Sequence, residues 1–320
     1  MKRFASCLAL VAVARLAATA SPLPAQTNQT STKSQKLADG VWAMQPEKGA
    51  NVGWFLLGDG VVAVDSGGDL ATGKDILQQI AETTGGKPVR MLIITHAHGD
   101  HTGGIRAFAA AGARIVCQEN IAGQILGLVT QQINDPGDPL SAKAGFHPAV
   151  EAISERVIFV DGIHNVQVYF LGAAHTKGDL IVYLVGDRVL YSGDIALNGL
   201  VPYMQSADVD PVGWERALAA IAKVGPEKLV PGHGEIGPVA GINDSLAYVR
   251  YAAALSKKFG DLGLSDERIP VEMRAPENAV KNIPVNDANI ANVQALTKTM
   301  RTRAAAGKPT AAAPTPTPHR

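Results

Sequence analysis

Short apolar runs alternate with amphipathic segments along the first half of the chain. Continuous or alternating apolar runs predict strands, and apolar positions three or four residues apart predict helices. Gly58-Asp59-Gly60 separates two apolar runs and predicts a hairpin turn, and the near-continuous run at 89–95 predicts a strand buried on both faces. The predicted strands of this half are 41–44, 52–57, 61–64, 89–95 and 114–117. The predicted helices are 73–83 and 119–132, followed by a proline-containing loop at 133–149.

The second half of the chain repeats this order, with strands first and helices after them. The predicted strands are 157–160, 166–171, 180–185, 188–192 and 229–230. The predicted helices are 210–224, with Asp210 as its N-cap and Pro211 as its first residue, and 243–260. Two such halves predict an α/β fold in which two sheets pack face to face with helices outside.

The two ends of the chain differ in composition from the region between them. Residues 1–25 combine a basic start with an apolar run and small residues, which is the pattern of a secretory signal peptide. A retained membrane anchor is the alternative, but the apolar run is short for a membrane span. Polar residues 26–38 are a predicted flexible linker, and residues 303–320, rich in Ala, Pro and Thr, are a predicted disordered tail. The predicted folded domain is 39–302, in a periplasmic or secreted protein with no membrane attachment after cleavage.

Composition excludes several classes of protein. Lysine plus arginine and aspartate plus glutamate both total 29, so no basic surface for nucleic acid is indicated. Aromatic residues make up only 5% of the chain, which is few for a platform that stacks bases. Cys117 is the one cysteine outside residues 1–25, so the mature chain has no partner for an intramolecular disulfide. The expected partner is a small-molecule substrate.

Four candidate metal ligands occur within six residues, directly after the buried strand predicted at 89–95. They are His96, His98, Asp100 and His101. His96 and His98 are two residues apart, so an extended backbone points both side chains the same way. A turn at Gly99 then directs Asp100 and His101 towards a second point. Imidazole and carboxylate at this density suit zinc or a similar divalent ion better than an ordinary solvated turn.

Three further candidate ligands each follow a predicted strand in the second half. They are His175, Asp194 and His233, and each lies beside glycine or other small residues. Strands that end on one edge of a sheet bring such loop side chains together. The remaining histidines outside the tail, His147 and His164, are expected to be solvated surface residues.

The motifs HAHGDH, HTKGD, SGD and PGHG occur in this order and resemble the metal-binding motifs of the metallo-β-lactamase superfamily. The Asp65-Ser66-Gly67 segment resembles the early aspartate of that family, and the resemblance covers about residues 39–260. It implies a four-layer αβ/βα sandwich with two metal ions in a groove at one edge. It also implies a ligand set: His96, His98 and His175 for the first metal, Asp100, His101 and His233 for the second, Asp194 as the bridge, and Asp65 as a residue that orients a ligand without binding metal.

The resemblance also implies a reaction. Two zinc ions, with iron or manganese as substitutes, would share a bridging hydroxide that attacks the carbonyl carbon of a lactone, thioester, ester or amide. Asp100 would orient the hydroxide and later pass on a proton. A non-catalytic metal-binding protein is the alternative outside the enzymes, but it would close each metal shell with four protein ligands. Here each metal has three ligands and a shared carboxylate, which leaves room for water.

A dedicated metallo-β-lactamase that confers antibiotic resistance is the alternative function within this family. The common lactamases of this superfamily resemble this chain, but they have a cysteine in place of Asp194 and a lysine in place of Leu197. Without that lysine, we expect weak activity on penicillins and carbapenems and better activity on an uncharged lactone, ester or thioester. Lys177, two residues after His175, is the candidate that would supply the missing positive charge.

Two loops are predicted to contact the substrate. Residues 45–53 link two early strands, and the resemblance implies that they overhang the metal groove and move. Residues 198–204 follow the Asp194 motif, and Tyr203 is the predicted contact within them. The alternative is that this loop is an ordinary surface turn with Tyr203 packed in the core.

The purified chain, prepared without chelator, should contain close to two metal ions, because the predicted ligands serve two sites. Elemental analysis by mass spectrometry measures this content. His98→Ala should lower both the metal content and the melting temperature, because metal binding adds to the free energy of folding. A content of one metal or none in the unaltered chain would contradict the dinuclear prediction.

Overall fold

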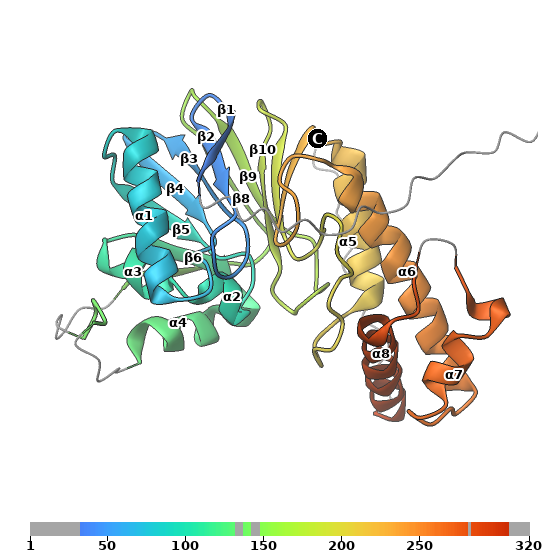
Figure 1. The fold of residues 1–320 in the computed structure, drawn as a ribbon. Helices are drawn as coiled ribbons and strands as arrows, with labels where there is room; N and C mark the ends of the chain where they lie inside the picture. Colours follow the sequence, from blue (N-terminus) through green and yellow to red (C-terminus); the bar gives the residue numbers. More distant parts are fainter. Residues whose placement is uncertain (1–32, 132–136, 142–147, 281–282, 307–320) are drawn as a thin grey trace, which may run out of the picture.

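The strands of the structure bury one set of side chains between two sheets and the other set beneath helices. The computed structural model describes residues 33–131, 137–141, 148–280 and 283–306. Two sheets face each other, and helices cover the outer face of each sheet (Figure 1). The four-layer αβ/βα sandwich predicted from the sequence is confirmed.

The first sheet has seven strands that follow one another in sequence order. The first four pair antiparallel, and the remaining pairs are parallel with helices in most of their connections. Gly58 has a positive φ of 59° in the predicted hairpin turn. The strands are β1 (Gln35–Ala38), β2 (Val41–Met44), β3 (Val52–Leu57), β4 (Gly60–Val64), β5 (Val89–Ile93), β6 (Arg114–Gln118) and β7 (Val150–Ile153).

The second sheet has five strands in the order β12-β11-β10-β9-β8. Four of them form an antiparallel meander, and the last pairs parallel to β11 after a helical crossover. The strands are β8 (Arg156–Val160), β9 (Asn165–Phe170), β10 (Leu180–Leu184), β11 (Val189–Gly193) and β12 (Lys228–Pro231).

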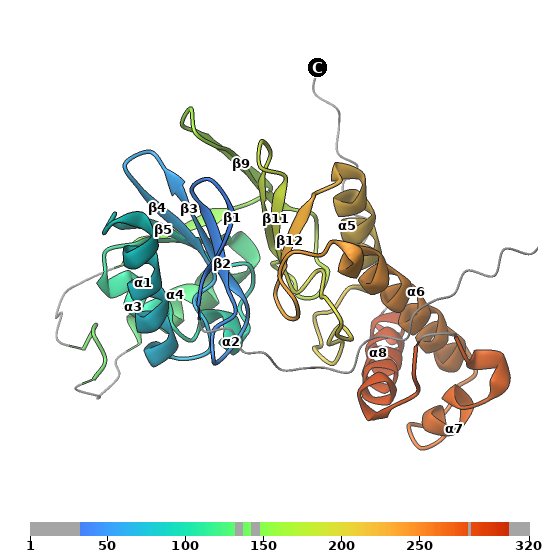
Figure 2. The same cartoon turned by 45° about the horizontal axis from the view of Figure 1, so that its top comes forward.

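The helices form two groups on opposite sides of the sandwich. In Figures 1 and 2, α1 and α3 lie outside the first sheet, α5 lies outside the second sheet with α6 beside it, and α8 packs against α6. Asp210 caps α5 by accepting hydrogen bonds from the main chain of Val212 and Gly213, as predicted. The helices are α1 (Leu70–Thr84), α2 (Gly99–Thr102), α3 (Ile105–Ala110), α4 (Ala122–Thr130), α5 (Pro211–Val224), α6 (Ala240–Asp261), α7 (Ile269–Met273) and α8 (Asp287–Ala305). None of the described helices is long and apolar enough to cross a membrane.

Three apolar layers stabilise the sandwich. Between the sheets, Phe55 and Ile93 meet Val182 and Tyr191. Leu92, adjacent to Ile93, faces the opposite way into the layer beneath α1, α3 and α4, so β5 is buried on both faces as its apolar run predicts. The third layer lies between the second sheet and α5, α6 and α8. Complete burial of side chains of this size stabilises the fold by about 1.5–3 kcal/mol each.

The regular structure extends closer to both termini than the sequence pattern indicates. β1 lies inside the predicted linker 26–38, because its backbone pairs with β2 and one of its side chains is buried. At the other end, α8 continues to Ala305, inside the predicted tail 303–320. The predicted signal peptide 1–25 lies outside the described residues.

His164 corrects a second expectation. It is 5% exposed rather than solvated, and its Nδ1 atom lies 2.8 Å from Oδ2 of Asp187. Its ring also packs edge-on against Phe55, with centroids 6.4 Å apart. A histidine that is hydrogen-bonded to a carboxylate tolerates burial, and its local sequence contains no sign of this partner. His147 lies outside the described residues.

Gly53→Ala should destabilise the fold, because a Cβ atom at Gly53 would lie 2.0 Å from Cε1 of Tyr191 on the facing sheet. Overpacking of this kind costs roughly 1–3 kcal/mol of unfolding free energy. Urea unfolding of the full chain measures the cost. Gly127→Ala is the control, because this glycine lies in α4 with nothing within 4 Å of the new Cβ, and alanine should be neutral or stabilising there. Equal stability of the two variants would contradict the close approach of the sheets.

Candidate metal centre

The seven predicted ligands lie after strand ends on one edge of the sandwich. Four of them follow β5 of the first sheet, and the other three follow β9, β11 and β12 of the second. A backbone hydrogen bond of 2.8 Å from Leu180 N to Thr95 O joins the two edges. The structure therefore brings all seven side chains together: His96, His98, Asp100, His101, His175, Asp194 and His233.

The first group of ligands comprises His96, His98, His175 and Asp194. The Nδ1 atom of His98 lies 3.0 Å from Nε2 of both His96 and His175. One ligand atom from each of the four residues lies within 4.8 Å of the others. His98 has extended backbone angles directly before α2, and this conformation places its ring beside that of His96. The group converges on a single point.

The second group comprises Asp100, His101 and His233. Asp100 and His101 lie in α2, and Oδ2 of Asp100 is 3.0 Å from Nε2 of His233 and 3.9 Å from Nε2 of His101. The side chain of His101 is completely buried, whereas those of His233 and Asp100 are 31% and 42% exposed. The turn that begins at Gly99 therefore directs this pair away from the first group and towards an accessible position.

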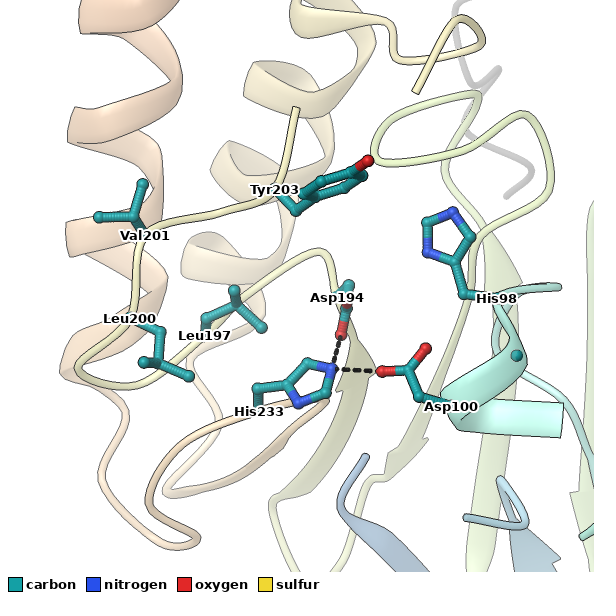
Figure 3. A pocket seen from close by; sticks show the side chains of 9 residues that line it. His98, Asp100, Asp194, Leu197, Leu200, Val201, Tyr203 and His233 are labelled. Carbon is teal, nitrogen blue, oxygen red and sulfur yellow. Dashed lines mark ion pairs between the residues drawn. The ribbon is translucent and has the colours of Figure 1, made fainter. Parts of the chain in front are cut away.

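Asp194 lies between the two groups. Its Oδ2 atom is 3.4 Å from Nε2 of His175 and 3.9 Å from Nε2 of His96. Its Oδ1 atom is 3.3 Å from Nε2 of His101 and 3.7 Å from Nε2 of His233. Figure 3 shows the ion pair with His233 as a dashed line. One carboxylate thus presents one oxygen to each group, which is the arrangement expected of a ligand shared by two metal ions.

Two buried atoms at this position, Nε2 of His101 and Oδ1 of Asp194, form an ion pair at 3.3 Å but have no hydrogen-bond partner among the described residues. An unpaired buried polar atom costs about 1–3 kcal/mol, so a bound ion is a natural partner for both. A Cβ atom at Gly232 would lie 1.8 Å from Oδ1 of Asp194, so glycine keeps this space free. Imidazole nitrogens and carboxylate oxygens are donors that zinc and similar divalent ions accept. The residues therefore fit two metal ions.

Asp65 orients the ring of His101 through its Nδ1 atom, on the side opposite Nε2. Its Oδ2 atom accepts hydrogen bonds of 2.8 Å from Nδ1 of His101 and Oγ1 of Thr95, and its Oδ1 atom accepts one of 2.8 Å from the Thr95 amide. Asp65 has a φ of 60°, a left-handed conformation that aspartate tolerates better than most residues. With a ring proton held at Nδ1 by Asp65, Nε2 is the atom that His101 offers to the second group.

His175 is oriented by a backbone carbonyl. Its Nδ1 atom lies 3.2 Å from the carbonyl oxygen of Tyr203, and its ring packs edge-on against Trp214 with centroids 5.2 Å apart. The turn after His175 is closed by Asp179, which accepts hydrogen bonds of 2.8 Å from the amide and hydroxyl of Thr176. Burial raises the pKa of Asp179 to about 7, although these hydrogen bonds oppose the shift. Because the Tyr203 carbonyl lies against Nδ1, the ring of His175 presents Nε2 to the first group.

Burial and neighbouring charges set the protonation of the centre. Burial lowers the pKa of His96 well below its usual value and that of His175 to about 4, so both rings are neutral at neutral pH. Burial acts the same way on His101, but the carboxylates of Asp65 and Asp194 outweigh it and raise its pKa. Burial opposes ionisation of Asp194, but the surrounding histidines, His101 foremost, hold its pKa well below the usual value. His96, His175 and Asp194 are therefore in the forms that bind metal, whereas His101 would have to lose its Nε2 proton when a metal binds there.

A groove of about 490 Å³ opens beside the two groups. The polar side of the groove is lined by His98, Gly99, Asp100, Asp194 and His233. The other side, here called the apolar wall, consists of Leu197, Leu200, Val201 and Tyr203 (Figure 3). Leu200 and Val201 lie within the predicted substrate loop 198–204, in which Tyr203 was the one residue predicted as a contact.

Tyr203 lies on the groove with 49% of its surface exposed, so the alternative that it packs in the core is wrong. Lys177 is exposed and does not line the groove. Its amide lies 3.4 Å from Oδ2 of Asp208, and its carbonyl accepts a hydrogen bond of 3.0 Å from Asn120. These contacts fix the Lys177 backbone at the surface, and the proposed role of its charge towards a substrate stays a prediction.

None of residues 45–53 is among the residues that line the groove, so their predicted contact with the substrate stays a prediction. The amide of Ala50 donates a hydrogen bond of 3.0 Å to the carbonyl of Asp100. The main-chain and side-chain amides of Asn51 donate hydrogen bonds of 2.7–2.9 Å to three carbonyls of segment 231–234. This loop therefore holds together the two segments that carry the second group.

Comparison with known proteins agrees with this geometry. Residues 46–233 match the family model of the metallo-beta-lactamase superfamily. Because the match covers more than half of the chain, the chain belongs to this superfamily. It is 21% identical to a metallo-beta-lactamase from Pontibacter korlensis of known structure, with a TM-score of 0.56 over 68% of this chain and 98% of that one.

Two curated relatives have different activities in their names. A linear primary-alkylsulfatase from a Pseudomonas species is 22% identical over 71% of this chain and 50% of its own length. A metallo-beta-lactamase type 2 from Elizabethkingia meningoseptica is 27% identical over 58% of this chain and 69% of its own length. The chain thus spans half the length of the first relative and about two thirds of the second.

Asp65→Asn should weaken metal binding at the second group by roughly 10–100-fold, because the amide cannot accept all three hydrogen bonds and favours the wrong tautomer of His101. Competition with a chromogenic chelator measures the affinity of each site. Asp138→Asn is the control for general destabilisation, because Asp138 is a buried carboxylate that bonds to Arg106 and to the amides of Leu140 and Ser141, none of which is a candidate ligand. Equal affinities in Asp65→Asn and the unaltered chain would rule out this orienting role.

Proposed function

We propose that this chain is a dinuclear metal-dependent hydrolase that cleaves a carbonyl bond in a small-molecule lactone, thioester, ester or amide. The observation that carries the proposal is Asp194, which presents one oxygen to each of two histidine-containing groups beside an open groove. A non-catalytic metal protein would have no need of accessible ligands, whereas Asp100 and His233 both line the groove.

Bound divalent ions would activate a water molecule for attack and polarise the substrate carbonyl. The chain supplies the proton transfer. A hydrogen bond to His233 lowers the pKa of Asp100, so its carboxylate is ionised at neutral pH and can accept a proton from the attacking water. Its position on the groove allows it to return that proton to the leaving group. Cys117 is completely buried, and burial raises the pKa of its thiol to about 11, which disfavours it as a nucleophile.

Zinc is the proposed metal, with iron or manganese as substitutes. Five imidazoles and two carboxylates suit zinc. The shared ligand is an oxygen donor rather than a thiolate, and oxygen donors also admit iron and manganese. The basic and apolar start of the chain supports a periplasmic or secreted location for this enzyme.

The apolar wall favours an uncharged substrate. Its residues offer hydrophobic surface to an acyl chain or ring, and the described residues that line the groove include no lysine or arginine. A penicillin or carbapenem carries a carboxylate, which would lie against this wall without a partner. The relatives that are named metallo-beta-lactamases support a dedicated β-lactamase as the second candidate function.

The value of kcat/KM for a lactone and a thioester should exceed that for a carbapenem by at least about tenfold, because the groove lacks a cation for the carboxylate. Steady-state kinetics on these substrates, with a chromogenic cephalosporin and a linear alkyl sulfate as further arms, measure the ratio. Lys177→Ala should leave the ratio unchanged, because this side chain does not line the groove. A carbapenem preferred by orders of magnitude, with the preference lost in Lys177→Ala, would establish the β-lactamase instead.

A further inference from the structure

The C-terminal helix α8 contacts the groove although it lies beyond residues 46–233, which match the family model. Its contact is made by Asn292, which is 2% exposed. The side-chain amide of Asn292 donates a hydrogen bond of 2.8 Å to the carbonyl of Pro202, and its Oδ1 atom accepts one of 3.0 Å from the amide of Met204. These two hydrogen bonds fix the position of the backbone on both sides of Tyr203.

The second amide hydrogen of Asn292 donates a hydrogen bond of 2.8 Å to the hydroxyl of Tyr248 on α6. Both donors and one acceptor position of the amide are therefore satisfied in a buried place, which fixes the orientation of the group. Because α6 and α8 also pack against each other, Asn292 presents a rigid surface to the loop.

Tyr203 lies between the two backbone groups that Asn292 binds, and it contacts both sides of the groove. Its carbonyl oxygen lies 3.2 Å from Nδ1 of the candidate ligand His175. Its side chain belongs to the apolar wall and lies edge-on to His98, with ring centroids 6.4 Å apart (Figure 3). A displacement of the Tyr203 backbone would therefore change both the orientation of a ligand and the shape of the wall.

The other end of the same loop is held by α6. The amide of Leu197 donates a hydrogen bond of 3.1 Å to the hydroxyl of Ser245, and Oδ1 of Asn198 accepts one of 3.0 Å from the amide of Gly241. The apolar wall thus spans between two anchors, one on α6 and one on α8. Neither anchor belongs to the segment that carries the family motifs.

We propose that Asn292 is a positioning residue that sets the substrate preference of the groove, through Tyr203, for the hydrolase proposed above. The wall binds the apolar part of the substrate, and its position depends on the two backbone hydrogen bonds to Asn292. The residue acts on KM for apolar substrates and on the affinity of the site that contains His175. It does not contact the reacting atoms.

Asn289 provides a matched control on the same helix. It is also completely buried, but its side-chain amide donates to the carbonyl of Pro284, and its main-chain amide bonds to Asn286. Neither partner lies in the loop 197–204. Replacement of either asparagine by leucine removes a buried amide from α8, but only Asn292→Leu releases the backbone of the loop.

The test compares Asn292→Leu and Asn289→Leu in the full chain loaded with zinc. In Asn292→Leu, KM for an ester with a long apolar acyl chain should rise about tenfold relative to the corresponding acetyl ester, with a smaller effect on kcat. Zinc affinity at one of the two sites, measured by chelator competition, should fall about tenfold. Hydrogen exchange of the segment 198–206 should accelerate. Asn289→Leu should change none of these values, even if its melting temperature falls equally.

Tyr248→Phe provides a second test with a milder change. It removes one partner of the Asn292 amide, and it should move the acyl-chain preference and the exchange rate in the same direction by a smaller factor. This variant decides the proposal if Asn292→Leu does not fold.

Equal exchange and zinc affinity in the Asn292 and Asn289 variants, or an unchanged preference between the two esters, would overturn the positioning role. Failure of the proposed function gives a different result, since the unaltered chain would then turn over none of the substrates. Hydrogen exchange and zinc affinity would still decide the role of Asn292 in that case.

Discussion

The burial of the Asp194 carboxylate among four imidazole rings is the interaction on which the rest of the centre depends. An ion in such a place costs several kcal/mol unless charges and hydrogen bonds compensate it, and Asp194 is only 7% exposed. His101 provides the main compensation, and Asp65 stabilises that ring from the other side. Oδ1 of Asp194 and Nε2 of His101 nevertheless have no hydrogen-bond partner among the described residues. Two divalent ions would satisfy both atoms, so folding and metal binding are coupled here.

The two sheets bring this carboxylate and its partners together by strand pairing. β11 and β12 are parallel neighbours, so Asp194 and His233 leave the sheet side by side. β5 contributes the remaining residues of the second group, and the backbone bond between Thr95 and Leu180 aligns its end with β10. The loop 45–53 then joins the segments of Asp100 and His233. Rigid strand ends and short links restrict the ligands to one geometry, which a metal site requires.

The two sides of the groove are held in place by different parts of the chain. Both sides lie in the segment 46–233 that matches the superfamily, but the loop that forms the apolar wall is anchored by α6 and α8, which lie beyond that segment. A conserved fold can therefore retain one metal chemistry while the surrounding helices change the substrate.

The sequence by itself determined most of the strands and helices and the layer architecture, because burial imposes a local period on apolar positions, but it did not locate β7, α7 or α8. It also identified the seven candidate ligands, because their motifs are short and directly follow strands. It did not reveal the pairing of β1, the burial of His164 beside Asp187, the place of Lys177 outside the groove, or the anchoring of loop 45–53. Each of these depends on a partner that is distant or unmarked in the sequence. Only the tertiary structure decided them, because no local pattern records which distant backbone or side chain will meet a given residue.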